Sequence, residues 1–137
     1  MRDLLLQELE PYRSDEDTRF AIDGPDLLVK PKAALALGMA FHELATNAAK
    51  YGAFSKPEGR VRVEWEVVRA SEPSALRLKW TETGGPPVKK RERKGFGSTV
   101  IERGLSLELE GEVRLDFNPG GLVCAMEIPL PRAGGGE

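Results

Sequence analysis

Residues 42–51, His-Glu-Leu-Ala-Thr-Asn-Ala-Ala-Lys-Tyr, set three polar side chains at helical spacing within a run that is otherwise rich in alanine. Glu43, Asn47 and Lys50 stand at positions i, i+4 and i+7, so an α-helix would present them on one face. A carboxylate, an amide and an ammonium in a row supply the chemistry of a magnesium triphosphate site. An exposed helix often carries the same residue types as a solvated polar stripe, and the spacing alone does not separate these two interpretations.

This segment forms the second half of a long predicted helix. From Lys32 to Tyr51 the helix-favouring residues Ala and Leu dominate. Pro31 suits the first helical position, where a backbone N–H would have no helical partner. Gly52 follows at the place where a residue in the left-handed conformation often ends a helix. We therefore expect one helix over residues 32–51 that carries the polar face.

The segment before this helix predicts a short helix and two short strands. Leucines among charges over residues 2–10 indicate an amphipathic helix, which Pro11 ends. Residues 19–22 and 27–29 are strand-like runs, and they flank the turn Asp-Gly-Pro-Asp at residues 23–26.

The segment after the helix predicts four strands and one more helix. Residues 60–68 alternate apolar and charged side chains, and residues 76–80 repeat the pattern after a turn, as in an antiparallel pair. Residues 98–110 have helical periodicity. The runs 112–117 and 122–128 flank a hairpin signal, Asn-Pro-Gly-Gly. The economical architecture is a two-layer α/β sandwich, with a mixed, mostly antiparallel sheet and helices on one face.

Composition indicates one ordinary domain. The chain has 137 residues, of which 40% are hydrophobic and 31% are charged. Its formal net charge of -2 offers no basic field for nucleic acid, and no apolar run approaches the roughly 20 residues that span a bilayer. Cys124 is the only cysteine, and it fits the reducing cytoplasm as a small core residue. We expect a monomeric, cytoplasmic domain without nucleic-acid or membrane contacts, and a disordered tail over residues 133–137.

A second candidate cluster follows the strand at residues 76–80. In Glu82-Thr83-Gly84-Gly85, the carboxylate can accept a hydrogen bond from the exocyclic amino group of adenine. The glycines would let the backbone approach a flat base. Considered alone, these four residues fit an ordinary turn better than a base site.

A third candidate lies at the start of the helix predicted at residues 98–110. Residues 89–94 are almost wholly charged and predict a solvated loop that could move over a ligand. Gly95-Phe96-Gly97-Ser98 then offers bare amides suited to phosphate oxygens. A lone Gly-x-Gly is weak evidence, and the basic residues of the loop are more simply a wet surface, with one or two of them screening phosphate charge.

His42 is the sole histidine, and its simplest role is that of a partly buried side chain bonded within the fold. One His and one Cys cannot form a metal cluster of their own. The chain also lacks the Gly-x-Ser-x-Gly elbow of a Ser-His-Asp hydrolase.

Together these blocks resemble the catalytic, ATP-binding domain of bacterial sensor histidine kinases, in the ATPase superfamily shared with gyrase and the large heat-shock chaperone. Residues 42–51 resemble the N box of that superfamily. Residues 80–87, Trp-Thr-Glu-Thr-Gly-Gly-Pro-Pro, resemble the Trp-x-Glu signature of the HWE subfamily, which is named for an N-box His and for that Trp and Glu. This chain has all three, as His42, Trp80 and Glu82, and the resemblance covers nearly all of its length.

The resemblance implies a role for each motif residue. Asn47 would bind magnesium, Lys50 would bind phosphate, and Glu82 would bind adenine. The catalytic candidates are Glu43, near the reacting phosphate, and His42. The implied nucleotide-binding residues are Asn47, Lys50, Tyr51, Glu82, Gly84, Gly85, Gly95, Phe96, Gly97 and Ser98. An ATP lid is implied between Pro86 and Lys94.

The implied function is transfer of the γ-phosphoryl group from ATP, with Mg²⁺, to a histidine in two-component signalling, with a response regulator downstream. The phosphoacceptor histidine of such kinases lies in a separate dimerisation domain, and this chain has only His42. That domain would adjoin residues 1–12 of a catalytic domain that covers residues 1–132.

Glu82 also stands where most of the superfamily has Asp in an Asp-x-Gly-x-Gly box, and its longer side chain reaches further. Two alternatives stay open. One is a non-catalytic nucleotide-sensing or docking module. The other is a serine kinase of the anti-sigma type, which fits the missing acceptor but not the Trp-x-Glu signature.

Overall fold

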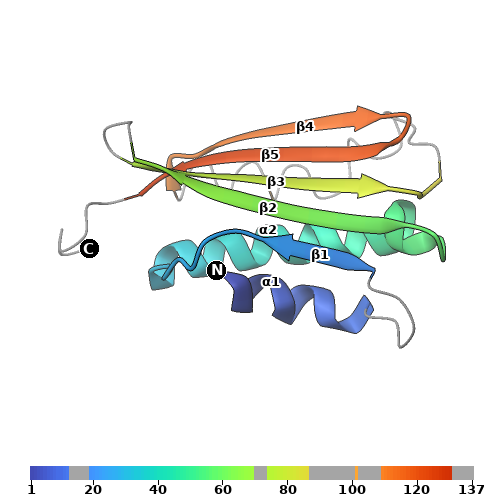
Figure 1. Ribbon diagram of the computed structural model, residues 1–137, viewed down its shortest axis with the longest axis horizontal. Coiled ribbons are helices and arrows are strands. Elements are labelled where there is room, and N and C mark those ends of the chain that lie inside the picture. Colours follow the sequence, from blue (N-terminus) through green and yellow to red (C-terminus); the bar gives the residue numbers. More distant parts are fainter. Residues whose placement is uncertain (13–18, 70–73, 87–100, 102–108, 131–137) are drawn as a thin grey trace.

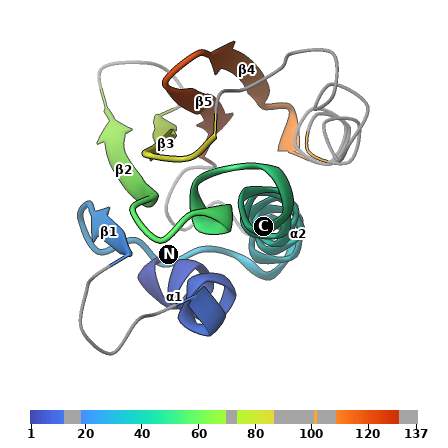
Figure 2. The same cartoon turned by 90° about the vertical axis from the view of Figure 1, so that its right-hand side faces the viewer.

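The computed structural model of the chain describes residues 1–12, 19–69, 74–86, 101 and 109–130. Its five strands form one sheet in the order β1-β2-β3-β5-β4, and α1 and α2 lie on one face of it (Figures 1 and 2). The expected two-layer α/β sandwich is therefore confirmed. The elements are α1 (Arg2–Leu9), the 3-10 helix η1 (Glu10–Tyr12), β1 (Phe20–Asp23), α2 (Pro31–Tyr51), the 3-10 helix η2 (Ala53–Ser55), β2 (Arg60–Val68), β3 (Ala75–Thr83), β4 (Glu112–Asn118) and β5 (Gly121–Pro129).

The sheet is mixed and mostly antiparallel, as expected. β1 runs parallel to β2, while the pairs β2–β3, β3–β5 and β4–β5 are antiparallel. β2 and β3 pair along their whole lengths, from Arg60 opposite Thr83 to Val68 opposite Ala75. Apolar and charged residues alternate on both strands, so one face of the sheet is buried under the helices and the other is polar.

α2 covers the buried face of the sheet and supplies much of the core (Figure 1). The helix begins at Pro31, as predicted. Its inner residues pack in one cluster with the inner residues of the strands, among which Trp80 is 0% exposed. The buried residues of α2 recur at helical spacing: Ala36, Leu37, Ala40, Phe41, Leu44, Ala45, Asn47 and Ala48. Asn47 belongs to this set, so the predicted polar face borders the core and is not fully exposed to solvent.

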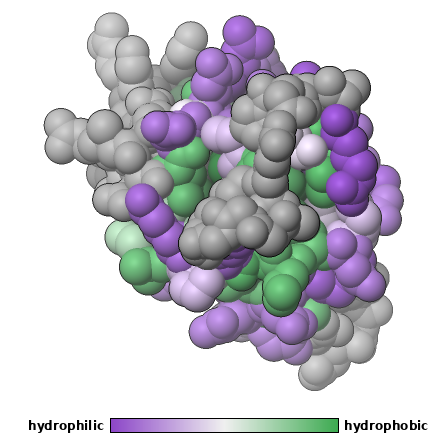
Figure 3. All heavy atoms as spheres, turned by 90° about the vertical axis from the view of Figure 1, so that its left-hand side faces the viewer, coloured by the Kyte–Doolittle hydropathy of each residue, from purple (hydrophilic) through white to green (hydrophobic). Residues whose placement is uncertain are grey.

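The two halves of α2 present different surfaces. Leu35 and Met39, one turn apart in its first half, are 69% and 54% exposed, and Leu28 in the preceding connection is 97% exposed. Figure 3 shows this end of the molecule, where hydrophobic surface (green) lies between hydrophilic side chains (purple). The second half carries the polar residues of segment 42–51, and it ends beside η2 at the opposite end of the molecule (Figure 2).

The prediction of a second strand at residues 27–29 is wrong. This segment has no strand neighbour, and β1 pairs with β2 instead. One backbone carbonyl of this segment, and one of the turn before it, accept hydrogen bonds from other parts of the chain. The Trp65 indole N–H donates to the carbonyl oxygen of Pro25 (2.8 Å), and the N-terminal amine donates to that of Leu27 (2.9 Å). Side-chain and terminal donors thus replace the ladder that a strand would need.

The prediction of a left-handed residue at Gly52 is also wrong, since its φ is -121° and its ψ is -144°. Gly52 N–H still donates to the carbonyl oxygen of Ala48 (3.0 Å). The backbone N–H and the hydroxyl of Ser55 then both donate to the carbonyl oxygen of Gly52, at 3.0 and 2.6 Å. The backbone groups at the junction of α2 and the short helix η2 are therefore hydrogen-bonded without a left-handed cap residue.

The other predicted elements that can be compared are confirmed. α1 is the first predicted helix, and η1 carries the chain across Pro11. β2, β3 and the β4–β5 hairpin lie in the segments where strands were predicted. In the helix predicted at residues 98–110, Ile101 and Leu109 are helical and pack against the core, and residues 98–100 and 102–108 lie outside the described residues. Residues 87–94 of the predicted lid and the predicted tail also lie outside them. No helix in the described part of the chain is long and apolar enough to cross a membrane.

The turn between β4 and β5 brings backbone against β3. Gly121 has a φ of +142°, and a Cβ atom added there would lie 1.9 Å from the backbone oxygen of Glu82. A Cβ atom on the neighbouring Gly120 would meet no heavy atom within 4 Å. Close approach and backbone conformation therefore require glycine at position 121 and not at position 120.

We predict that Gly121→Ala lowers the free energy of unfolding by at least about 2 kcal/mol, because backbone strain adds to a clash with a backbone atom that cannot rotate away. Gly120→Ala should change it by no more than about 0.5 kcal/mol. Urea unfolding of both variants measures the difference. Equal stabilities would contradict the geometry described for the hairpin.

Candidate functional site

The buried carboxylate of Glu82 is the centre of the candidate site. Glu82 lies near the end of β3, and it is only 2% exposed. Its Oε2 accepts a hydrogen bond from the Trp80 indole N–H, and its Oε1 accepts one from the backbone N–H of Ala53, both at 3.1 Å. Burial of a carboxylate costs free energy unless such donors compensate for lost water, so these two bonds fix where the group lies.

The spacing of Trp80 and Glu82 follows from the geometry of a strand. Residues i and i+2 point to the same side of a sheet, so both side chains enter the layer between the sheet and α2. The indole of Trp80 fills the core while its N–H finds an acceptor, as a buried Trp requires. The Trp-x-Glu motif thus places a hydrogen-bonded carboxylate at the edge of an apolar core.

Glycines bring several backbone segments close to Glu82. Gly84 has a φ of +74°, and a Cβ atom there would lie 2.6 Å from the carbonyl oxygen of Glu58. A Cβ atom on Gly85 would lie 2.9 Å from the backbone nitrogen of Ala53. The turn after β3 and the segment after α2 are therefore in backbone contact, which side chains at positions 84 and 85 would prevent.

The predicted polar residues of α2 lie along its last turns, next to this contact. Ala53, the donor to Glu82, comes two residues after the end of α2. Lys50 is exposed and Tyr51 half-buried in the last turn. Asn47, one turn earlier, is 9% exposed, and Glu43, a further turn back, is half-buried. Their order along the helix brings the amide closer than the acid to the end that contacts Glu82.

The structure places His42 on another side of α2. Its side chain is 63% exposed, and its Nδ1 lies 2.9 Å from Oε1 of Glu8 on α1. Five residues along a helix turn the direction of a side chain by about 140°, so His42 points well away from Asn47. His42 therefore links α2 to α1, and its predicted catalytic role stays a prediction.

One group in the site, the backbone N–H of Ala53, could not be predicted from the sequence. The donor to Glu82 Oε1 is the main-chain N–H of Ala53, which any residue except proline could supply. Gly95, Phe96, Gly97 and Ser98, predicted to bind phosphate, lie outside the described residues.

The donor set fits Mg²⁺ only as part of a metal–phosphate complex. Within residues 1–12, 19–69, 74–86, 101 and 109–130, no three His, Cys, Asp or Glu side chains gather as a metal cage. Mg²⁺ prefers oxygen ligands and keeps several from water and substrate phosphates. The amide oxygen of Asn47 suits such a site, because phosphates then supply the negative charge.

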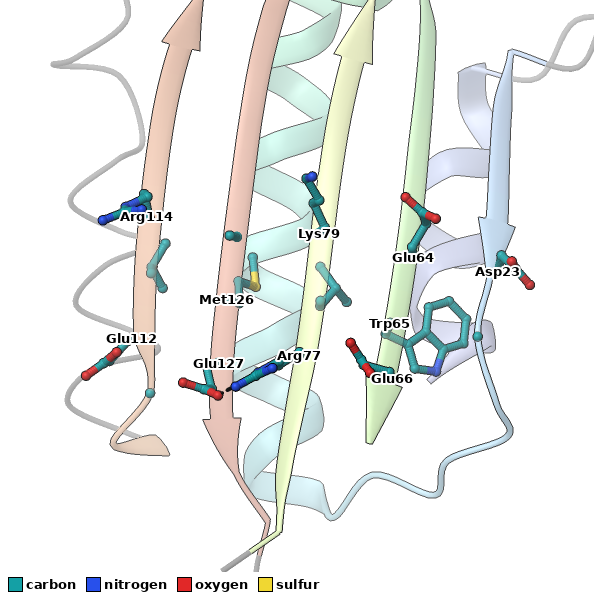
Figure 4. A pocket seen from close by; sticks show the side chains of 15 residues that line it. Asp23, Glu64, Trp65, Glu66, Arg77, Lys79, Glu112, Arg114, Met126 and Glu127 are labelled. Carbon is teal, nitrogen blue, oxygen red and sulfur yellow. Dashed lines mark hydrogen bonds and ion pairs between the residues drawn. The ribbon is translucent and has the colours of Figure 1, made fainter. Parts of the chain in front are cut away.

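An open hollow on the opposite, polar face of the sheet has different chemistry (Figure 4). It is lined across β1 to β4 by side chains of both signs, among them Glu64, Lys79 and Arg114. Arg77 Nε donates to Glu127 Oε1 at 2.8 Å, and this bond and the charge of Glu127 raise the pKa of Arg77. Exposed charges in alternation are typical of the wet face of an antiparallel sheet, so we do not assign the site there.

Curated relatives of the chain are histidine kinases. The blue-light-activated histidine kinase of Brucella anthropi is 35% identical over 122 residues, which cover 89% of this chain and 25% of that protein. The blue-light-activated histidine kinase of Brucella abortus is 34% identical over the same shares. The chain thus spans about a quarter of the length of these relatives. No model of a known protein family matches it.

Solved structures show the same fold. The catalytic domain of histidine kinase ThkA has a TM-score of 0.66 at 15% identity, covering 94% of this chain and 92% of that one. The blue-light-activated histidine kinase EL346 of Erythrobacter litoralis has a TM-score of 0.70 at 15% identity, covering 94% of this chain and 40% of that one. Sequence and fold agree with the family resemblance carried by His42, Trp80 and Glu82. The chain is thus similar in sequence to blue-light-activated histidine kinases, and it has the fold of histidine kinase catalytic domains.

Proposed function

We propose that this chain binds ATP with Mg²⁺ and transfers the γ-phosphoryl group to a histidine on a separate dimerisation domain. The observation that carries the proposal is the buried carboxylate of Glu82, held beside glycine backbone at the end of the α2 polar face. The Brucella relatives, named blue-light-activated histidine kinases, support the same chemistry.

Glu82 is the proposed acceptor for the adenine amino group. A carboxylate has about four lone-pair sites, so one such group can accept several hydrogen bonds, as Glu82 does from Trp80 and Ala53. A site built to accept a hydrogen bond discriminates strongly against a base that lacks the donor, because the buried oxygen then loses its partner. Gly84 and Gly85 would leave room for the flat base.

Asn47 and Lys50 are the proposed contacts to the metal–triphosphate part of ATP. Asn47 would supply an amide oxygen, and Lys50 an ammonium group near the phosphates. Mg²⁺, when bound, would neutralise charge on the phosphate oxygens. Gly95 to Ser98 remain the proposed backbone donors to phosphate.

Glu43 is the proposed base for the transfer. In this reaction a P–N bond forms to the acceptor imidazole while the P–O bond to ADP breaks, and Glu43 would accept the proton that the imidazole loses. Because the chain holds a single histidine, His42, which bonds to Glu8, we place the acceptor outside this chain. We further propose a cytoplasmic reaction that passes the phosphoryl group to a response regulator, by analogy with ThkA, whose structure is known in complex with its response regulator TrrA.

Nucleotide binding predicts a thermal shift that depends on Glu82. At a hundred times its dissociation constant, Mg²⁺–ATP should stabilise the wild type by about 2.7 kcal/mol. Glu82→Ala should lose most of this stabilisation, since the base contact is removed. Glu64→Ala, on the polar face of the sheet, should retain it. Thermal unfolding with and without Mg²⁺–ATP measures the effect, and a wild type that ATP does not stabilise would rule out the nucleotide site.

Phosphoryl transfer predicts a label on a supplied acceptor. Incubation with γ-labelled ATP and a separately produced histidine kinase dimerisation domain should give an acid-labile label on the histidine of that domain. Glu43→Gln should slow transfer by about 10²-fold or more while ATP still binds, because a general base typically contributes that much. Glu66→Gln, on the polar face, is the matched control. Label on serine would indicate the serine kinase alternative, and ATP binding without label would indicate a docking module.

A further inference from the structure

The segment that holds Glu82 is itself held by a half-buried arginine, Arg19. Nη2 of Arg19, just before β1, donates to the carbonyl oxygens of Ala53 (3.2 Å), Lys56 and Gly59 (3.3 Å). Three carbonyls of one short loop thus converge on a single charged nitrogen. Hydrogen bonds to charged groups are stronger than those between neutral groups, so this contact adds to the restraint that the turn bonds of the loop over residues 53–59 provide.

Aromatic contacts fix the same loop. The guanidinium carbon of Arg19 lies 5.3 Å from the centroid of the Phe54 ring, within the range of a cation–π contact. Tyr12 of η1 stacks on Phe54 with centroids 4.8 Å apart and an interplanar angle of 8°. Nε of Arg19 is buried, and no hydrogen-bond partner for it is found among the described residues. The position of the guanidinium is therefore set by its contacts to the loop.

Ala53 connects this contact to Glu82. Arg19 binds the carbonyl oxygen of Ala53, while the N–H of the same residue donates to Oε1 of Glu82. A shift of the loop would move both groups together, because they belong to one residue. The opposite side of the carboxylate is held by Trp80, whose position the core fixes. The other donor, the N–H of Ala53, lies in the loop that Arg19 contacts.

We propose that Arg19 is a positioning residue for base recognition, which acts through Ala53 to orient the carboxylate of Glu82 toward the adenine amino group. The proposal rests on the proposed function. It assigns Arg19 no contact with the nucleotide. A role in orientation alone predicts a selective loss, in which recognition of the 6-amino group weakens and phosphate binding does not.

Two nucleotides distinguish a change in the orientation of Glu82 from a general loss of nucleotide binding. We propose isothermal titration of the folded chain with ATP and with purine riboside triphosphate, which lacks the 6-amino group, both with Mg²⁺. The wild type should prefer ATP. Arg19→Met keeps an apolar stem but removes the donors, and it should weaken ATP binding about tenfold. Binding of purine riboside triphosphate should change less than about twofold.

Two more variants complete the test. Arg60→Met removes bonds to the carbonyl oxygens of Pro57 and Gly59 in the same loop but leaves the Ala53 contact, and it should keep the wild-type preference. Arg19→Lys keeps a charge that cannot span all three carbonyls, so its preference should fall between those of Met and wild type. This variant decides the matter if Arg19→Met fails to fold.

The outcomes distinguish this proposal from the one on which it rests. Wild-type preference for ATP in both Arg19 variants, or equal weakening toward both nucleotides, would overturn the role of Arg19 and leave the proposed function intact. A wild type that binds neither nucleotide would overturn the proposed function, and the role of Arg19 with it.

Discussion

A carboxylate buried at the edge of an apolar core is the constraint on which the rest of this molecule depends. Glu82 is 2% exposed, and a charged group so far from water is stable only among donors. The Trp80 indole and the Ala53 backbone supply them. Each donor comes from a different part of the fold, so the sheet, the end of α2 and the following loop must all be in place before the carboxylate is satisfied.

The sheet topology makes this assembly possible. β3 lies between β2 and β5, and its end meets both the loop after α2 and the turn of the β4–β5 hairpin. Close backbone contacts at Gly85 and Gly121 leave no space for side chains at this junction. Rigid surroundings of this kind suit a group that must recognise one base. The side chain of Glu82 loses its conformational entropy when the protein folds, so binding does not have to order it.

Period and spacing predicted most of this fold. The alternation of apolar and charged residues predicted β2 and β3. The 3.6-residue period of apolar residues, together with Pro31, predicted α2. The spacing of two between Trp80 and Glu82 already places them on one side of a strand. The segment over residues 27–29 was mispredicted as a strand because the carbonyl of Leu27, like that of Pro25 in the preceding turn, bonds to a group distant in sequence: the N-terminal amine for Leu27 and Trp65 for Pro25. The contacts of Ala53 and Arg19 also join residues that are distant in sequence. They could not be predicted, because no sequence motif marks a backbone N–H or a single arginine as a contact of this kind.

A structure of this chain with Mg²⁺ and a non-hydrolysable ATP analogue tests the central claim most directly. The measured quantity is the distance from the carboxylate oxygens of Glu82 to the 6-amino nitrogen of adenine. Our account predicts a hydrogen bond of about 2.7–3.2 Å, with the bonds from Trp80 and Ala53 retained and the triphosphate beside Asn47. A base bound elsewhere, or a base in this place whose amino group makes no contact with Glu82, would contradict it.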